Sequence, residues 1–531
     1  MNKKVLVFRK PIIILIIGIF IGVFLLKWQA SVIPVISYAD GVSYISAAGN
    51  QGYYEHNTLT GTWVHASQWK EFWKESSFFQ FDKIRYDIAH YDIHPPLYFW
   101  ILHIWSYIVG IDLSTGPILN IFFHVLTSIL IFIICRRLQC SYLIAVAAGL
   151  LWLLNGSIVS AAQETRQYSL LALCSVLYLW CLLAYLQKKS VRTLIYLTIA
   201  AVLGMLTHYH FGLLVSTSVM YVAIYMISKK NWVHLFRFVV ALGIAALIFF
   251  MIHPEFYVSF ERQVFQAQAF SVENMIPRAI NCRNTIIELF KPKIPIGWLQ
   301  KLALFIAFTG SVILGIKYTK KQKNKVNSLK HFFRTHKGLP IFAVLIITSI
   351  SFALYIFQYS PLHAMNVKYM MLVVPIYFIL IGQFFHLVIP QKLMAYMFIP
   401  IIIFQTIDTS INIKRYEINS KKLEKAISEN IATGTPIILD SSGRGVLPRI
   451  LWHVDDNTNV YATTQSNLIS EFPELKTYSH ILYVSNLEYH GNNLENQMAI
   501  LEKFDKQGYK LKGEITNLVN SKIFLLIKTD K

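Results

Sequence analysis

The chain has 531 residues, of which 55% are hydrophobic and only 15% are charged. A soluble domain usually carries about 25% charged residues, so this composition excludes an ordinary soluble enzyme, a fibrous protein and a disordered chain. Five cysteines are too few for a disulfide scaffold. The net charge of +21 does not indicate nucleic-acid binding, because the excess of Lys and Arg lies in short loops between apolar segments, as in the cytoplasmic loops of membrane proteins.

Apolar segments recur along the chain at the length of about 20 residues that a helix needs to cross a bilayer. The first is too long and too apolar for a signal peptide, so we expect it to be an anchor. The candidate spans lie near 11–33, 94–110, 117–135, 141–161, 168–187, 193–208, 211–228, 235–252, 298–316, 339–357, 369–388 and 393–412.

Basic residues between these spans set the expected orientation. We expect the groups at 1–10, 136–137, 188–189, 229–230, 317–337 and 392 on the cytoplasmic side. The N-terminus is then inside, and the tail after about residue 413 is outside. Both ends of 94–110 also fall outside, so this segment is expected to be tilted or re-entrant. The pattern predicts a mainly α, polytopic protein of the cell membrane with about 11 transmembrane helices.

Two regions are expected to face water outside the cell. Residues 34–93 form the first external loop, in which Trp69, Phe72 and Trp73 share one helical face. That face predicts a helix lying in the membrane interface. Residues 413–531 are expected to form a soluble extracytoplasmic α/β domain, because predicted strands and helices alternate there. Its expected elements are helices at 414–432, 446–453 and 492–507 and strands at 436–440, 479–485 and 522–528.

Acidic and cationic residues stand at both ends of the first external loop. Asp40 follows the first span and is either functional or simply solvated. The loop closes on the sequence YDIHPPLY at 91–98. Its two prolines suit a helix start, where backbone N–H groups have no partner, but they do not explain Asp92 and His94. His94 could bind a phosphate, bind a metal together with Asp92, or cap the helix.

Three further groups are expected on the same side of the membrane. The sequence QETRQY at 163–168 places charges close to hydrocarbon, where they usually face a polar cavity or pair with each other, as Glu164 and Arg166 could. The turn THY at 207–209 could belong to an aromatic belt, and Lys368 at the start of a span could simply snorkel. Together these residues predict a loop-covered external cavity with one acid, several cations and a rim of aromatic rings, which suits a lipid-linked phosphate donor.

With these motifs the chain resembles the GT-C glycosyltransferases of the family-39 type, which include protein O-mannosyltransferases and bacterial lipid A aminoarabinose transferases. The resemblance rests on Asp40, on YDIHPPLY and QETRQY, and on the THY turn and Lys368 with its following Tyr369. It covers about residues 1–412, which would form the transmembrane catalytic domain. The tail at 413–531 fits the variable soluble domain that many members carry.

The resemblance implies transfer of a sugar from a polyprenyl-phosphate donor to an acceptor outside the cytoplasm, with inversion. It implies that Asp40 is the catalytic base. It further implies donor-phosphate binding by His94, Arg166, Lys368 and Tyr369, with Asp92 and His94 as candidate ligands if a divalent metal takes part. Supporting or substrate-binding positions implied in the same way are Tyr44, Glu55, Asp92, Tyr98, Glu164, Tyr168, His208 and Tyr209.

The sequence departs from the family at two positions. Gly41 follows Asp40 where many members have a second acid, which Glu55, Asp87 or Asp92 would have to supply. Lys368 stands where many members have Arg, so a phosphate contact there would be monodentate.

The alternative hypothesis is a transporter or flippase for lipid-linked sugars, although the sequence lacks the matching halves that such proteins often have. The identity of the sugar stays open, as does the choice of a protein, lipid or cell-wall polymer as acceptor. We hypothesise that residues after 413 help to select that acceptor.

Overall fold

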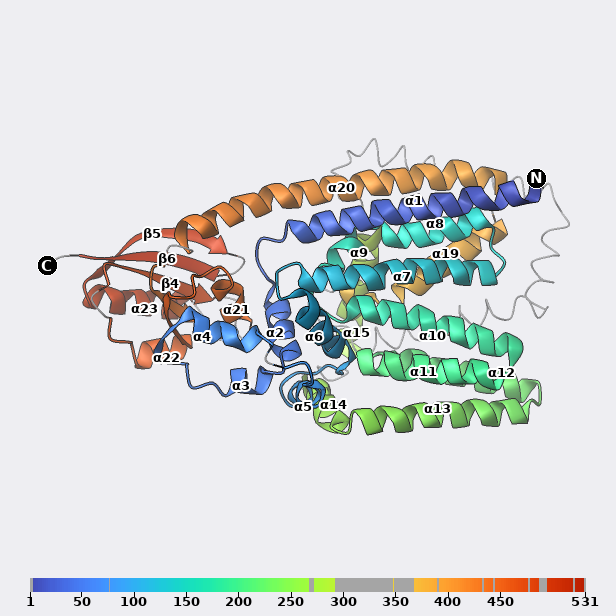
Figure 1. Cartoon of the computed structure of the whole chain (residues 1–531), viewed down its shortest axis with the longest axis horizontal. Coiled ribbons are helices and arrows are strands. Elements are labelled where there is room, and N and C mark those ends of the chain that lie inside the picture. The colour runs from blue at the N-terminus through green and yellow to red at the C-terminus, as the bar shows by residue number, and fades with distance from the viewer. Residues whose placement is uncertain are drawn as a thin grey trace.

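The computed structural model describes residues 3–75, 77–266, 272–291, 347, 367–388, 391–431, 434–442, 445–475, 478–486, 494–518 and 521–529. A bundle of long helices lies at one end of the molecule and a mixed α/β region lies at the other (Figure 1). The expected spans 298–316 and 339–357 and the basic loop 317–337 lie outside the described residues, apart from Ile347.

The bundle is built from helices whose composition suits a lipid environment. Five described helices are long and apolar enough to cross a membrane, and several of their large apolar side chains face outward, such as Phe20, Phe236 and Met251. The bundle helices are α1 (Lys3–Ser31), α7 (Thr115–Arg137), α8 (Tyr142–Leu153), α10 (Tyr168–Lys188), α11 (Val191–Thr207), α12 (Phe211–Ser228), α13 (Trp232–Ile252), α19 (Val374–Val388) and α20 (Gln391–Asn430).

The basic turns lie together at one end of the bundle. The turns between α7 and α8, between α10 and α11 and between α12 and α13 are all found at the end where α1 begins (Figure 1). The α/β region lies beyond the opposite end. The arrangement therefore agrees with the grouping of loops that the positive charges predict.

Two of the expected spans are not single helices long enough to cross a membrane. Helix α6 (Leu97–Val109) has 13 residues and is about 20 Å long, short of the roughly 30 Å of a hydrocarbon core, as expected for a segment that does not cross fully. The expected span at 141–161 is wrong as a single helix, because it breaks between α8 and α9 (Gly156–Ala161). Asn155 lies at this break and accepts hydrogen bonds from the backbone N–H groups of Ser157 and Ile158.

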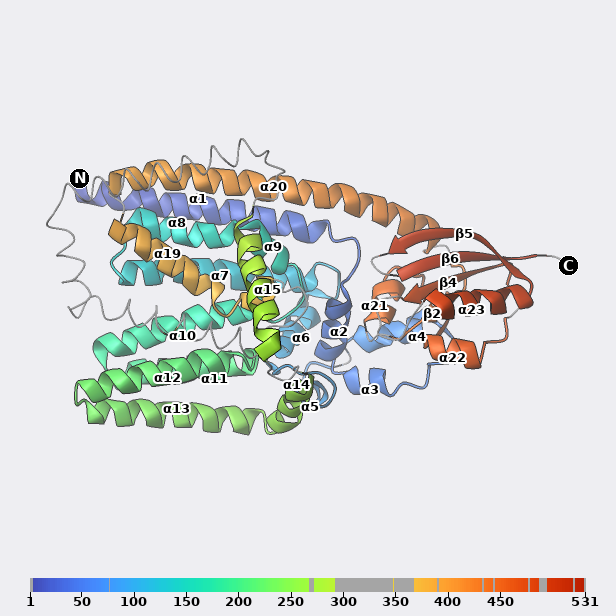
Figure 2. The ribbon, with the colours of Figure 1, turned by 180° about the vertical axis from the view of Figure 1, so that it is seen from behind.

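Helix α20 joins the two ends of the molecule. It has 40 residues and combines the expected span at 393–412 with the expected polar helix at 414–432. Both views show it running beside α1 and continuing to the sheet (Figures 1 and 2). The helix therefore continues without a break from the bundle to Asn430, seven residues before β2 begins.

The α/β region contains a six-stranded mixed sheet in the order β1-β3-β2-β4-β6-β5. The three strands and the two short helices expected after residue 435 are present, whereas β3, β5 and α22 were not anticipated. β2 is parallel to β3 and β4, and the other pairs are antiparallel. The elements are β1 (Trp63–His65), β2 (Ile437–Asp440), α21 (Val446–Leu451), β3 (Asn459–Thr463), α22 (Gln465–Ser470), β4 (His480–Asn486), α23 (Leu494–Lys506), β5 (Tyr509–Leu518) and β6 (Ser521–Lys528).

The first external loop is part of this region. Its strand β1 pairs with β3 at one edge of the sheet. Trp69 is fully buried, and Trp73 stacks on Trp452 at a ring-centroid distance of 5.8 Å. The aromatic face expected in the membrane interface is therefore packed against protein. The other elements of the loop are α2 (Tyr38–Ala47), α3 (Gln51–Glu55), α4 (Ala66–Lys70), η1 (Glu71–Trp73) and α5 (Phe81–Tyr91).

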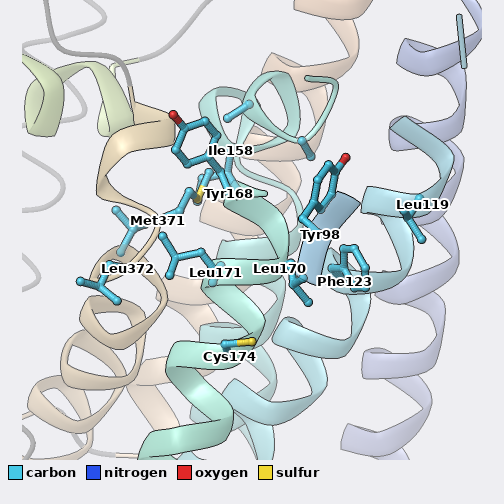
Figure 3. Packing of buried hydrophobic residues seen from close by; sticks show 14 of the residues in the cluster. Tyr98, Leu119, Phe123, Ile158, Tyr168, Leu170, Leu171, Cys174, Met371 and Leu372 are labelled. Carbon is cyan, nitrogen blue, oxygen red and sulfur yellow. The ribbon is translucent and has the colours of Figure 1, made fainter. Parts of the chain in front are cut away.

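One hydrophobic cluster runs through the bundle and into the α/β region. Near the first turn of α10 it includes Tyr98, Ile158 and Leu171 (Figure 3), and in the sheet it includes Ile437 and Leu439. Three shorter elements are α14 (Phe256–Gln266), α15 (Val272–Phe290) and η2 (Val367–Met370); α14 packs on α5, and α15 and η2 pack on α9 and on each other. The continuous core holds α2 and the loop before α10 between bundle and sheet.

Candidate functional site

Asp40 is held in the first turn of α2 by a reciprocal cap. The hydroxyl of Ser37 accepts a hydrogen bond from the Asp40 backbone N–H at 3.2 Å, and the Asp40 carboxylate accepts one from the Ser37 N–H at 3.3 Å. This is the geometry of a capping box. The Thr165 N–H donates to the other carboxylate oxygen at 2.6 Å. Asp40 is thus fixed to the loop that precedes α10.

The surroundings of Asp40 favour a weak base. Burial raises the pKa of its carboxyl group to about 6, and the nearby charge of Glu164 acts in the same direction. The hydrogen bonds from Ser37 and Thr165 and the charge of Arg166 oppose this shift. A carboxylate with such a pKa is mostly ionised at neutral pH and can still take up a proton.

Asp92, His94 and Arg166 form a connected buried group. Nδ1 of His94 lies 2.8 Å from Oδ1 of Asp92, and Nη2 of Arg166 lies 3.3 Å from Nε2 of His94. With Nδ1–H donating to Asp92, Nε2 is free to accept from Arg166. Burial opposes ionisation of Asp92, but His94 and Arg166 together hold its pKa below the ordinary value. Arg166 also donates to the Ser43 hydroxyl at 3.2 Å, which links the group to α2.

Glu164 and Lys368 pair with each other. Nζ of Lys368 lies 2.6 Å from Oε2 of Glu164, and it lies 5.3 Å from the centroid of the Tyr369 ring. Tyr168 meets Tyr369 edge to face at 5.6 Å. Of the alternatives left open for these charges, a direct Glu164–Arg166 pair is not the one observed, because Glu164 pairs with Lys368 and Arg166 contacts His94. The charge of Glu164 raises the pKa of Asp40, and Glu164 is not among the residues that the sequence analysis named for a second acid.

The THY turn is only partly in the site. The ring of His208 lies 5.8 Å from that of His94, and burial lowers the pKa of His208 well below its ordinary value, so it is neutral. Tyr209 turns to α13, where its hydroxyl lies 2.8 Å from Nε2 of His253. His208 therefore belongs to the candidate site, whereas the contacts of Tyr209 are with the bundle.

Three of the expected supporting residues, Tyr44, Tyr98 and Glu55, contact other parts of the fold and line neither of the two cavities described below. The Tyr44 hydroxyl donates to the Asp112 carbonyl at 3.0 Å and accepts from the Gly116 N–H at 2.9 Å, so it ties α2 to the loop before α7. Tyr98 is fully buried in the core beside Phe99, and its hydroxyl points toward the same end of the cluster as that of Tyr168 (Figure 3). Glu55 ends α3, next to α5.

Two cavities lie on either side of the first turn of α2. The cationic cavity has a volume of about 260 Å³ and is lined by Tyr38, Ala39, Val42, Tyr91, Asp92, Ile93, His94, Arg166 and Arg262. The Asp40 cavity has a volume of about 390 Å³ and is lined by Gln29, Ile33, Val35, Ser37, Asp40, Ser160, Gln163, Glu164, Asn412, Arg415, Tyr416 and Asn419. The turn of α2 and the loop at 163–166 contribute to both.

Sequence reasoning missed several residues of these walls. Arg262 follows a span without any motif around it. Asn412, Arg415, Tyr416 and Asn419 recur at spacings of three and four, which places them on one face of a helix. That spacing was visible in the sequence, but a polar face after a span is also typical of a helix that simply emerges into water.

The site does not fit a divalent metal in this arrangement. Among the described residues, no group of three or more His, Cys, Asp or Glu side chains comes together. The candidate ligands Asp92 and His94 are hydrogen-bonded to each other, and the guanidinium of Arg166 lies beside the imidazole. A fixed positive charge at that place opposes the binding of a second cation.

Comparisons with known proteins bear on the fold of the chain. Residues 93–257 match the model of a family described as dolichyl-phosphate-mannose-protein mannosyltransferase, whereas no curated protein matches the sequence. The chain is similar to the crystal structure of ArnT from Cupriavidus metallidurans bound to undecaprenyl phosphate, with 12% identity, a TM-score of 0.51 and coverage of 96% of this chain and 97% of that chain. The apo structure of the same protein gives 13% identity, a TM-score of 0.50 and the same coverage. At this level of identity the likeness shows the fold, and the chain is therefore a polytopic protein with the GT-C fold of ArnT.

Proposed function

We propose that the protein transfers a sugar from a polyprenyl-phosphate donor to a hydroxyl group outside the cytoplasm, with inversion at the anomeric carbon. The observation that carries this proposal is the position of Asp40. A buried carboxylate with a pKa of about 6 lines one cavity, and a cavity with two arginines and a histidine lies on the other side of the same helical turn. The likeness to a structure bound to undecaprenyl phosphate supports the class of donor.

The cationic cavity suits the departing phosphate. As the bond between the sugar and the donor phosphate breaks, negative charge grows on that phosphate, and fixed cations stabilise it. Arg166 offers a planar fork of donors for phosphate oxygens, and Arg262 lines the same cavity. His94 can donate to phosphate only if it changes its present hydrogen bonds or takes up a proton. Lys368 is paired with Glu164, so we assign it and Tyr369 to holding the loop at 163–166.

Asp40 suits the opposite side of the reaction. The acceptor hydroxyl attacks the anomeric carbon, its proton passes to the Asp40 carboxylate, and the electron pair of the broken C–O bond leaves with the phosphate. Inversion requires the attacking oxygen and the phosphate on opposite faces of the sugar. The backbone N–H groups of Ser37 and Thr165 orient the carboxylate and leave it capacity to accept one more hydrogen bond.

The test is sugar transfer by membranes containing the wild type or Asp40→Asn, supplied with polyprenyl-phosphate sugars and a crude extract of acceptors. Loss of a general base lowers the rate by about 10²–10⁴-fold, so we expect a fall of at least about a hundredfold. The matched control is Asp82→Asn, since the Asp82 side chain in the same loop is 97% exposed. Full activity of Asp40→Asn would exclude Asp40 as the base. No transfer with any donor by folded wild-type protein would overturn the enzyme and favour a transporter.

A further inference from the structure

His103 lies in the middle of α6 and is fully buried. Its Nδ1 lies 2.9 Å from the carbonyl oxygen of Ala47, and its Nε2 lies 2.9 Å from the carbonyl oxygen of Phe78. A carbonyl oxygen only accepts hydrogen bonds, and a neutral imidazole carries a hydrogen on one nitrogen alone. Both bonds therefore exist together only when His103 is an imidazolium, with a hydrogen on each nitrogen.

A buried carboxylate lies beside this cation. Glu75, in the loop between η1 and α5, places its Oε1 3.5 Å from Nδ1 of His103, and its side chain is only 6% exposed. Neither carboxylate oxygen has a hydrogen-bond partner among the described residues, and of the cationic side chains described, only His103 lies within ion-pair distance. An unpaired buried charge is costly. The surroundings of Glu75 and the hydrogen bonds of His103 therefore point separately to a buried ion pair.

The ion pair holds the C-terminal end of α2, the helix that carries Asp40 in its first turn. The last carbonyl groups of a helix have no partner within it, and a cation near them is stabilised by the helix dipole. Ala47 is the last residue of α2, and α2 and α6 pack against each other (Figures 1 and 2). Helix α6 begins three residues after His94. His103 therefore connects the helix of Asp40 with the segment that contributes His94 to the cationic cavity.

A neutral link ties the same end of α2 to the chain before the cationic cavity. The side-chain amide of Gln51 accepts from the Ser46 hydroxyl at 2.7 Å and donates to the Tyr91 carbonyl at 3.1 Å. This link does not depend on the charge of His103. Removal of that charge therefore loosens this end of α2 without releasing it.

We propose that His103 is a positioning residue that stays an imidazolium at neutral pH. Glu75 keeps it charged, and the cation fixes the C-terminal end of α2 against α6 and against the loop before α5. The place of Asp40 relative to the cationic cavity is thereby set from both ends of α2, since the cap by Ser37 holds the other end. The positioning role rests on the proposed glycosyl transfer, whereas the charge of the pair does not.

The charge is tested without turnover by nitrogen NMR spectra at pH 8 of full-length protein in detergent, labelled with ¹⁵N-histidine. A histidine with the ordinary pKa of about 6.5 is about 97% neutral at that pH. The two protonated nitrogens of an imidazolium give signals distinct from those of a neutral ring. Among the signals of the 17 histidines, we expect imidazolium signals in the wild type that are absent from His103→Gln. Spectra in which His103→Gln removes only neutral-ring signals would overturn the proposal.

The positioning role is tested by sugar transfer and by melting temperature in His103→Gln, in Glu75→Gln and in the double variant. Each single change leaves one buried charge without its partner, which is strongly destabilising, whereas the double variant removes both charges. We expect kcat to fall about tenfold or more in each single variant. The double variant should melt higher and turn over faster than either. The matched control is Glu71→Gln, since the Glu71 side chain in the same external loop is 65% exposed and its loss should leave both measurements as in the wild type.

The outcomes separate the ion pair from the proposed function. Effects of the two single changes that simply add in the double variant would exclude the ion pair. An unchanged kcat in His103→Gln would exclude the positioning role. Wild-type protein that transfers no sugar would overturn the proposed function, and the positioning role with it, whereas the NMR spectra and the melting temperatures would still decide the charge of His103.

Discussion

The two cavities beside α2 differ in the kind of buried polar atom that has no hydrogen-bond partner among the described residues, a carboxylate oxygen of Asp92 in the cationic cavity and two amide oxygens in the Asp40 cavity. In the cationic cavity, Asp92, His94 and Arg166 are bound to one another before any ligand arrives. In the Asp40 cavity, the amide oxygens of Gln29 and Gln163 have no partner among the described residues. The first arrangement is preorganised for one recurring charged group, as a phosphate would be. In the second, Asp40 and Glu164 are already paired, and the two amide oxygens gain a donor only when a ligand enters, which suits recognition of one particular molecule.

Among the substitutions that distinguish the cationic cavity from the Asp40 cavity, we expect the largest effect from Arg166→Ala. The substitution removes the cation that lies beside His94 and near Asp92, and loss of one preorganised group at developing charge costs about 10²–10³-fold in kcat. We expect a loss of this size in kcat/KM for the donor, measured from initial rates at varied donor concentration. Arg166→Lys keeps the charge without the planar fork and should recover only part of it. An unchanged kcat/KM in Arg166→Ala would remove the cationic cavity from the reaction.

A smaller effect is expected where α2 meets the α/β region. A Cβ atom at Gly41 would lie 2.6 Å from Cγ of Pro448 on α21, so Gly41→Ala forces the two helices apart. We expect destabilisation of about 1–3 kcal/mol and a moderate loss of kcat. The check is a double-mutant cycle of denaturant unfolding and activity with Pro448→Ala, which removes the clashing atom. Additive effects in the cycle would show that the close approach does not position α2.

The smallest effect concerns pH. Because burial raises the pKa of Asp40 to about 6, the base is lost as the pH falls below that value, and kcat/KM should drop tenfold per pH unit on the acidic side. The charge of Glu164 contributes to the raised pKa. Glu164→Gln should therefore move the acidic limb to lower pH. The pH–rate profiles of the two proteins decide this, and Lys368→Met serves as the control for loss of the Glu164–Lys368 pair alone. An acidic limb that stays in place in Glu164→Gln would exclude this coupling.

How much of the site could be predicted depended on whether its parts were close in the chain. Asp92 and His94 lie within one short motif, and the charges at 163–168 stand out against apolar flanks, so both were found. The partner of Glu164 lies 204 residues away, and only the folded chain shows that it is Lys368 and not Arg166. The glycine after Asp40 was noticed, but the close approach of Pro448, which leaves no room for a Cβ atom at Gly41, involves residues far apart in sequence.

The fold shows the same limit. Hydrophobic length identified the bundle helices, because a membrane span is a local property of the chain. It did not indicate that residues 63–65 form an edge strand of the sheet after residue 436, since three residues carry too little periodicity to predict a strand. Trp69 and Trp73 have the spacing of an amphipathic helix in either environment. Whether such a face meets lipid or protein depends on what the rest of the chain places against it.

The continuity of α20 determines how the sheet is placed relative to the bundle. Its 40 residues are about 60 Å long, which is roughly twice the hydrocarbon thickness. The length of the helix therefore sets the distance of the sheet from the bilayer. A helix also fixes direction, because each residue turns it by about 100°. One residue inserted after Ile413 would lift the sheet by only about 1.5 Å but rotate it away from β1. The rotation that the helix gives to the sheet, more than the length of the helix, therefore decides whether β1 of the first external loop can pair with β3.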